Sequence, residues 1–268
     1  MIARGNRCGS QIHTHQRRLL SAANKNKNNN NGILVSPNTR SHLIFGANTD
    51  VGKTVISAGL VQASLKEESN ATNVHYIKPL QCGGSDEFFV QRHCHVPPTK
   101  SLKASTLFQW ETPASPHLSS RNEKIPKSDK EVLEALNARL AEISTHSSSY
   151  YDSTRQQQQQ QQQTNITTTW IETAGGVLSP SSSSPDNNSP RHASSTSDKW
   201  GWLTQGDLYQ PLIGIAPVVL CGDGRLGGIS ATLTSLESLI LRGYDVAGII
   251  MLETGYDNVY AIREYANR

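Results

Sequence analysis

Apolar positions along the chain follow two patterns, short continuous runs and longer stretches with an apolar residue every three or four positions. The runs are typical of buried strands, and the recurrence at three and four is typical of amphipathic helices. We expect strands over residues 42–45, 74–77, 167–171, 216–220 and 246–252, the last of them buried. We expect helices over residues 55–66, 128–143, 229–241 and 257–266. This alternation predicts an α/β fold, a mostly parallel sheet with helices on both faces.

Two stretches interrupt the alternation. Residues 147–164 contain eight consecutive glutamines, and residues 179–199 are rich in Ser, Pro and Asn. Neither composition supplies enough apolar surface to offset the entropy lost on ordering the chain. We therefore expect two disordered surface insertions in one domain that spans residues 41–268.

The first 40 residues differ from the rest in charge. Residues 1–49 hold seven Lys or Arg and no acid, so the remaining residues have 18 basic and 22 acidic side chains, a balance of −4. A basic, acid-free start indicates an organellar presequence, and its arginines favour mitochondrial import; the alternative is a disordered basic tail. The mildly acidic remainder gives no indication of nucleic-acid binding, and no apolar run approaches the roughly 18 residues that cross a membrane.

A phosphate-binding loop is predicted between the first strand and the first helix. Its sequence, Gly-Ala-Asn-Thr-Asp-Val-Gly-Lys-Thr, covers residues 46–54. Backbone N–H groups in such a turn converge at a helix N-terminus, where Lys53 can reach β- and γ-phosphates and Thr54 can ligate Mg²⁺. The strict spacing would place the first glycine at Ala47, so Gly46 stands one residue early.

Polar residues also follow two other predicted strands. Lys78 comes directly after residues 74–77, and Glu172 directly after residues 167–171. Ligands of parallel sheets bind outside the carboxyl ends of the strands. We therefore expect Glu172 to hold Mg²⁺ near bound phosphates and Lys78 to orient a second anion, the alternatives being a surface carboxylate and an ordinary solvated lysine.

These motifs together resemble dethiobiotin synthetase. The resemblance rests on six segments in the order of that family, residues 46–54, 77–83, 84–86, 112–117, 172–176 and 221–230. It covers about residues 41–254 apart from the two insertions, and the last segment resembles the eukaryotic form. The family has a P-loop NTPase-like fold. The departures are Asn48, where the family usually has Asp, and Glu253-Thr254, where bacterial members have an adenine-binding Asn.

The resemblance implies an ATP- and Mg²⁺-dependent cyclo-ligase of biotin biosynthesis that makes dethiobiotin from 7,8-diaminopelargonic acid and CO₂. It implies catalytic roles for Lys53, Lys78 and Thr49. The implied ATP-binding residues are Gly46, Thr49, Asp50, Val51, Gly52, Lys53, Thr54 and Glu172. The implied substrate-binding residues are Lys78, Cys82, Ser115, Gly175, Gly227 and Gly228, and the implied Mg²⁺ ligands are Thr54, Asp86 and Glu172.

The resemblance also implies partners. It implies a homodimer, in which the helix beginning at residues 227–228 receives the substrate carboxylate across the interface, and a diaminopelargonate aminotransferase as a fused or separate partner. The family has one or two elements beyond the position of Arg268, so we expect either a truncated product or a remainder supplied by another chain. Two alternatives stay open. One is a nucleotide-switch ATPase, although residues 46–50 lack the early lysine usual there, and the other is a non-catalytic remnant.

Overall fold

The computed structural model describes residues 39–66, 71–152, 166–182 and 203–266. The basic N-terminal segment, apart from residues 39 and 40, lies outside these ranges, as do residues 153–164 and 183–199 of the two expected insertions. Among the residues that are described, no helix combines the length and the apolar character needed to cross a bilayer.

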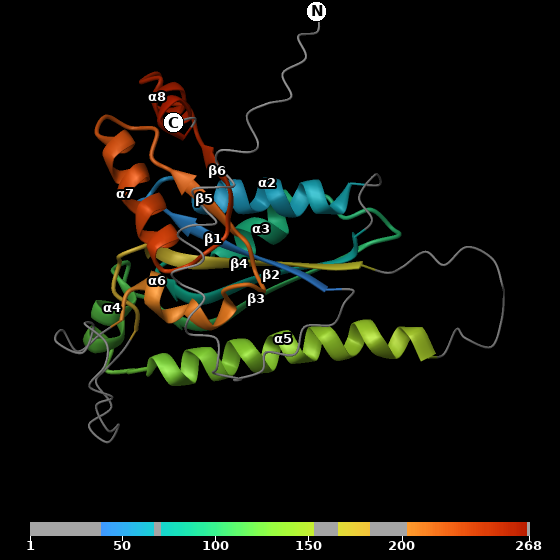
Figure 1. The fold of residues 1–268 in the computed structure, drawn as a ribbon. Helices are drawn as coiled ribbons and strands as arrows, with labels where there is room; N and C mark the ends of the chain where they lie inside the picture. Colours follow the sequence, from blue (N-terminus) through green and yellow to red (C-terminus); the bar gives the residue numbers. More distant parts are fainter. Residues whose placement is uncertain (1–38, 67–70, 153–165, 183–202, 267–268) are drawn as a thin grey trace, which may run out of the picture.

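A single parallel sheet forms the centre of the molecule (Figure 1), and it confirms the predicted fold class. The strand order across the sheet is β3-β2-β4-β1-β5-β6. The strands are β1 (Thr39–Gly46), β2 (Ala71–Cys82), β3 (Ser101–Trp110), β4 (Ile166–Gly176), β5 (Val218–Gly222) and β6 (Val246–Met251). All five pairings between neighbouring strands are parallel, so the carboxyl ends of the strands lie at the same edge of the sheet.

Helices cover both faces of the sheet (Figure 1). They are α2 (Lys53–Leu65), α3 (Asp86–His93), α4 (Pro116–Asn122), α5 (Asp129–Asp152), α6 (Gln205–Leu208), the 3-10 helix η3 (Gln210–Leu212), α7 (Gly228–Leu241) and α8 (Asn258–Ala266). Successive strand residues point to opposite faces. Ile44 and Tyr76 therefore pack toward α2 and α3, whereas Leu43 and Ile77 pack toward α5, α6 and α7.

The polar ends of two strands differ from the prediction. β2 continues four residues past Lys78, and β4 continues four residues past Glu172, so both side chains lie within strands and are buried. Pro79 is tolerated in β2 because it lacks an N–H donor where the ladder to β4 has already ended at Ile77.

Several short or peripheral elements were not predicted: α3, α4, α6 and β3. β3 is an edge strand with half-exposed, mixed polar side chains, so it has no apolar run. The prediction that residues 246–252 form a strand is confirmed, but the prediction that this strand is buried is wrong. β6 lies at the opposite edge of the sheet from β3, and Ile250 is 36% exposed.

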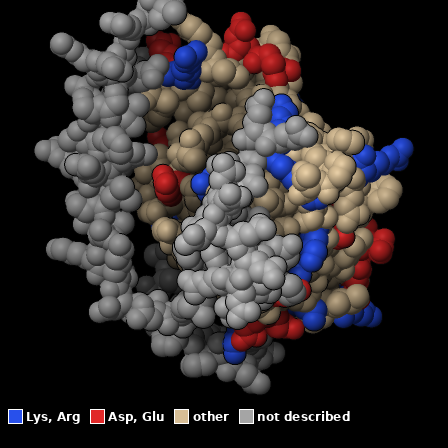
Figure 2. Space-filling model, turned by 90° about the vertical axis from the view of Figure 1, so that its right-hand side faces the viewer, with Lys and Arg blue, Asp and Glu red and all other residues tan. Residues whose placement is uncertain are grey.

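The boundaries of the insertions also need correction. Residues 147–152 belong to the last turns of α5. Residues 179–182 are tied to the domain, because the Ser181 backbone N–H donates to the Leu203 carbonyl at 2.8 Å and Pro180 pairs with Thr204. Figure 2 shows Lys/Arg and Asp/Glu side chains interspersed over the described part of one face of the molecule.

Candidate functional site

The loop after β1 is tied to the ends of its two neighbouring strands. The Ala47 N–H donates to the Cys221 carbonyl of β5 at 2.8 Å, and the Gly46 carbonyl accepts from the Val177 N–H at 3.1 Å. A Cβ on Gly46 would lie 2.9 Å from the Asn48 carbonyl oxygen, closer than side chains pack. The early glycine noted in the sequence is therefore required by the tight path of this loop.

Lys53 begins α2 and is almost fully buried. Its Nζ donates to the Asn48 carbonyl oxygen of the loop at 3.5 Å. Burial, followed by repulsion from the Lys78 ammonium, lowers the pKa of Lys53 below its ordinary value. A bound phosphate would relieve this cost, because it would supply negative charge beside the ammonium.

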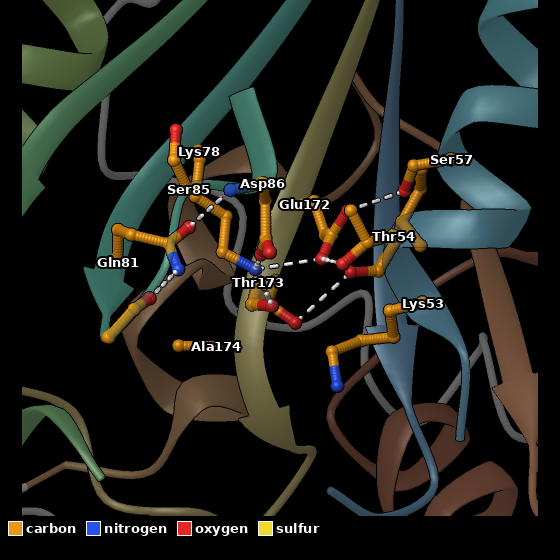
Figure 3. Close-up of polar contacts among 12 residues, drawn as sticks. Lys53, Thr54, Ser57, Lys78, Gln81, Ser85, Asp86, Glu172, Thr173 and Ala174 are labelled. Carbon is orange, nitrogen blue, oxygen red and sulfur yellow. Dashed lines mark hydrogen bonds and ion pairs between the residues drawn. The ribbon is translucent and has the colours of Figure 1, made fainter. Parts of the chain in front are cut away.

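Glu172 of β4 is fully buried and receives four hydrogen bonds, two on each carboxylate oxygen. Figure 3 shows Glu172 between Lys78, Thr54 and Ser57. Lys78 Nζ donates to Oε1 at 2.7 Å and Thr54 Oγ1 at 3.3 Å. Ser57 Oγ donates to Oε2 at 2.6 Å and the Tyr76 hydroxyl at 2.9 Å. Residues 54 and 57 share one face of α2, and residues 76 and 78 share one face of β2, so two elements enclose the carboxylate.

Lys78 joins two carboxylates. Its Nζ lies 2.7 Å from Glu172 Oε1 and 2.6 Å from Asp86 Oδ2, and both distances are those of direct ion pairs. Asp86 is the first residue of α3, whose preceding residue Ser85 caps the helix by accepting from the Phe88 N–H. Gln81 Oε1 accepts from the Asp86 N–H at 3.3 Å, which fixes the turn between β2 and α3.

The charges of this cluster stabilise one another. Burial alone would raise the pKa of Glu172, but the Lys78 ammonium and its hydrogen bond outweigh burial and hold that pKa below its ordinary value. Burial would likewise lower the pKa of Lys78, but Glu172 and Asp86 outweigh it and raise that pKa. Both shifts favour the ionised forms of Glu172 and Lys78, and thus the ion pair between them.

The oxygen atoms around Lys78 fit a hard divalent cation in their chemistry. A hydroxyl from Thr54 and carboxylates from Asp86 and Glu172 are ligand types that Mg²⁺ accepts, and Mg²⁺ needs only one or two protein carboxylates beside phosphates and water. Within the described ranges no group of three His, Cys, Asp or Glu residues surrounds a common point. Lys78 pairs with both carboxylates in this structure, so a cation would compete with its ammonium.

Other candidate residues of the loop are placed differently. Thr49 and Asp50 are exposed, whereas the Val51 side chain is in the core, which leaves only its backbone for a nucleotide. Asp50 and Gly52 have positive φ angles of 56° and 83°. The Thr49 carbonyl accepts from Arg225 Nη2 at 3.0 Å, on the side away from Lys78.

The candidate substrate residues flank the cluster without entering it. Gly175 adjoins the loop, since its carbonyl lies 3.0 Å from a Cβ built on Gly46. Cys82 ends β2, and Ser115 precedes α4, where its Oγ lies 3.0 Å from His117 Nδ1. Gly227 caps α7 in a left-handed conformation and Gly228 begins that helix, next to the Asp223 carbonyl.

Sequence reasoning missed several polar side chains of the site. Ser57 and Tyr76 donate hydrogen bonds to Glu172. Their spacing could have indicated them, because Ser57 follows Thr54 by three residues on a helix and Tyr76 precedes Lys78 by two residues on a strand. Asp223 was also missed, although it follows β5 directly. It accepts from Asn48 Nδ2 at 3.4 Å and pairs with Arg225 at 2.8 Å, which attaches the β5–α7 turn to the phosphate-type loop.

Comparisons with known proteins give a matching family model and several similar sequences. Residues 40–184 match the family model described as "AAA domain". The chain is 33% identical over 229 residues to "Bifunctional dethiobiotin synthetase/adenosylmethionine-8-amino-7-oxononanoate aminotransferase" of Emericella nidulans, a match that covers 84% of this chain and 23% of that protein. It is 30% identical over 276 residues to "Bifunctional dethiobiotin synthetase/7,8-diamino-pelargonic acid aminotransferase, mitochondrial" of Oryza sativa, covering 84% of this chain and 29% of that protein.

A shorter match extends to bacteria. An "ATP-dependent dethiobiotin synthetase" of Afipia carboxidovorans is 38% identical over 82 residues, which are 30% of this chain and 34% of that protein. These matches confirm the resemblance to dethiobiotin synthetase, although the chain spans less than a third of the length of the two bifunctional relatives. Because the family model covers more than half of its residues, the chain belongs to the AAA domain family.

Proposed function

We propose that this chain forms dethiobiotin from 7,8-diaminopelargonic acid, CO₂ and ATP, as a cyclo-ligase. The observation that carries the proposal is the meeting of Lys78, Asp86, Glu172 and Thr54 beside Lys53 at the start of α2. A cationic and carboxylate cluster next to a glycine-bearing loop and a helix N-terminus suits phosphoryl transfer, in which positioning and charge neutralisation supply most of the catalysis.

The proposed reaction has three steps. One substrate amine adds to CO₂ and loses a proton, which gives a carbamate. A carbamate oxygen attacks the γ-phosphorus of ATP, ADP leaves, and a carbamic–phosphoric anhydride forms. The second amine then attacks the carbamate carbon and loses a proton, phosphate leaves, and the ureido ring closes.

Each residue of the cluster has a proposed role in these steps. Lys53 neutralises the phosphates through the transfer, and Lys78 stabilises the carbamate and the transferring phosphoryl group. Thr54, Asp86 and Glu172 hold Mg²⁺, which would supply charge neutralisation of the phosphates when it is bound. The burial of Lys53 and Lys78 supports these roles, because few waters compete for their ammonium groups.

The residues that flank the cluster have proposed roles as well. We assign the loop backbone of residues 46–52 to the ATP phosphates, with Thr49 at its exposed turn. Gly175, Cys82 and Ser115 line the substrate side. Residues 227–228, at the N-terminus of α7, receive the substrate carboxylate, where unpaired N–H groups favour an anion.

Incorporation of ¹⁴C-bicarbonate into an acid-stable product tests the activity, with diaminopelargonate, ATP and Mg²⁺ present. We expect incorporation by the chain and its near-complete loss in Lys53→Ala and in Lys78→Ala. Lys103→Ala, which removes an exposed lysine of β3, is the matched control and should retain activity. Circular dichroism of each variant separates lost chemistry from lost folding.

The outcomes of this experiment are distinct. Absence of incorporation by the unaltered chain would contradict the proposed activity. Full incorporation by a folded Lys78→Ala variant would contradict the role of Lys78 alone.

The names of the relatives support proposals about the cellular location and the partners of this chain. The Oryza sativa and Arabidopsis thaliana relatives are named as mitochondrial, so we propose that the basic segment over residues 1–40 directs this chain to mitochondria. The same relatives are named as bifunctional with an aminotransferase, which supports an aminotransferase as fused or separate partner. We also propose a homodimer, and sedimentation equilibrium tests it.

A further inference from the structure

We propose that Ser57 and Tyr76 are positioning residues, which fix the Glu172 carboxylate so that only its Oε1 atom faces the Mg²⁺–phosphate site. The inference rests on the proposed function, because it concerns how the same site presents a ligand. Neither residue belongs to the motifs that carried the sequence prediction. Both were found from the hydrogen bonds that the fold creates.

The two carboxylate oxygens have different surroundings. Oε1 is shared by Thr54 and Lys78, the two residues that also face the loop and Asp86. Oε2 is bound by Ser57 Oγ at 2.6 Å and the Tyr76 hydroxyl at 2.9 Å. Each oxygen thus has one partner from α2 and one from β2, but only the partners of Oε1, Thr54 and Lys78, belong to the proposed Mg²⁺–phosphate site.

Rotation of the carboxylate would undo this arrangement. The terminal torsion of a glutamate has a broad energy well, so packing alone leaves the plane of the carboxylate free to rotate. Two hydroxyl donors on Oε2 fix that plane, since a partial rotation breaks both hydrogen bonds of a fully buried group, whereas a half-turn only exchanges two equivalent oxygens. A ligand whose orientation is fixed by neighbours binds a metal more tightly than a freely rotating one.

Tyr76 is suited to this role by its position. It is fully buried in the core between the sheet and α2, so its ring is held by packing. Its hydroxyl lies 2.9 Å from Glu172 Oε2 and donates to it. A rigid aromatic donor fixes the direction of its hydrogen bond more strictly than a flexible side chain would.

The alternative interpretation is that both hydroxyls only satisfy a buried carboxylate. In that case their removal lowers stability and leaves Mg²⁺ binding unchanged. The chain offers matched controls for both substitutions. Tyr209 is also fully buried, and its hydroxyl has no hydrogen-bond partner among the described residues. Ser64 lies on α2 and donates to the Leu60 carbonyl, away from the carboxylate.

The test measures binding of a non-hydrolysable ATP analogue by calorimetry while Mg²⁺ is varied. For Tyr76→Phe and Ser57→Ala we expect the Mg²⁺ concentration at half-maximal effect to rise about 10-fold, with analogue affinity in excess chelator unchanged. Ser57→Thr, which keeps the hydroxyl, should lie near the unaltered chain. Tyr209→Phe and Ser64→Ala should leave the Mg²⁺ dependence unchanged.

Each result decides one question. Mg²⁺ curves of Tyr76→Phe and Ser57→Ala that superimpose on that of the unaltered chain would overturn the positioning role and leave the proposed function standing. If the Mg²⁺ concentration at half-maximal effect rises as much in the two control variants as in the test variants, the positioning role is overturned too. If the unaltered chain shows no Mg²⁺ effect on analogue binding, both the positioning role and the proposed Mg²⁺ site are overturned.

Discussion

Lys78 has to compensate two carboxylates with one positive charge. In the structure its ammonium lies 2.6 Å from Asp86 and 2.7 Å from Glu172, at the point where a cation would meet both acids. Truncating one partner of a buried ion pair leaves an uncompensated charge, which costs more than the pair itself contributes. The lysine therefore stabilises the folded chain in addition to its proposed role in chemistry.

Lys78→Met tests this double role. We expect a loss of about 3–5 kcal/mol in the free energy of unfolding, because Glu172 keeps its burial and loses its countercharge. Millimolar Mg²⁺ should raise the melting temperature of this variant more than that of the unaltered chain, since the cation can take the place of the ammonium. Lys103→Met is the control, and an equal Mg²⁺ effect in all three proteins would contradict the competition.

At the scale of elements, turns and helix ends hold the site-bearing strands and helices in register. The α6 N-terminus is a capping box, in which the Thr204 hydroxyl accepts from the Asp207 N–H and Asp207 Oδ2 accepts from the Thr204 N–H, both at 3.2 Å. The Thr204 hydroxyl also donates to Asp207 Oδ2 at 2.6 Å. Arg242, at the C-terminal end of α7, donates to the other oxygen of Asp207 at 2.8 Å. The short helix α6 is thereby attached to α7, which begins at the candidate carboxylate site.

Asp207→Asn tests this connection through pH. Burial would raise the pKa of Asp207, but the hydrogen bond from Thr204 and the pairing with Arg242 hold it below its ordinary value of 3.8. A lowered folded-state pKa gives stability that is present above 3.8 and lost as the pH falls through the folded-state pKa. Urea unfolding should show a deficit of about 1.5–3 kcal/mol at neutral pH, and the deficit should shrink in acid. A deficit independent of pH would contradict the ionic origin.

Gly228→Ala tests the turn between β5 and α7. A Cβ at this position would collide with the backbone carbonyl of Asp223. A shift of Asp223 would break two hydrogen bonds, from Asn258 to its carbonyl and from Asn48 to its carboxylate. We expect a loss of about 1–3 kcal/mol in the free energy of unfolding. Gly59→Ala is the control within α2, where no atom lies near the new methyl group, and should stabilise by about 0.5–1 kcal/mol. Equal effects of the two substitutions would contradict the collision.

At the scale of the molecule, nucleotide binding should stabilise the whole domain. The site draws on β1, β2 and β4 and on helices α2 and α3, so a ligand there joins elements from both halves of the described sequence. Charge placed beside Lys53 would also relieve its repulsion with Lys78. A ligand that binds only the folded state raises stability in proportion to the logarithm of its concentration.

Thermal unfolding with ATP and Mg²⁺ tests this expectation. At 100 times the dissociation constant the gain should be about 2.7 kcal/mol, seen as a rise in melting temperature. Lys53→Ala should show little rise, and without ligand its melting temperature should equal or exceed that of the unaltered chain, because one of two repelling charges is gone. A marked rise in the melting temperature of Lys53→Ala on addition of ATP and Mg²⁺ would contradict binding at this loop.

Much of the fold and the site could be predicted from the sequence. Strand and helix positions with continuous or periodic apolar residues were confirmed, because burial on both faces of a parallel sheet demands such patterns locally. The loop over residues 46–54 was recognised for a similar reason, since its glycines and the residues at the start of α2 act through the backbone of one short segment.

Only the tertiary structure decided how distant segments meet. The edge strand β3 lacks a clear apolar pattern because it has a neighbour on one side alone, whereas β6 has an apolar run and only its place at the opposite edge leaves it partly exposed. The partners of Glu172 come from residues 54, 57, 76 and 78, about a hundred positions away along the chain, and no local pattern encodes that meeting. The sequence by itself thus determined the elements with a clear apolar pattern and the phosphate-binding loop, whose chemistry is local. The ion-pair cluster and the hydrogen bonds to Glu172 Oε2 exist only because the fold places the parallel strands β2 and β4 beside each other and packs α2 and α3 against them.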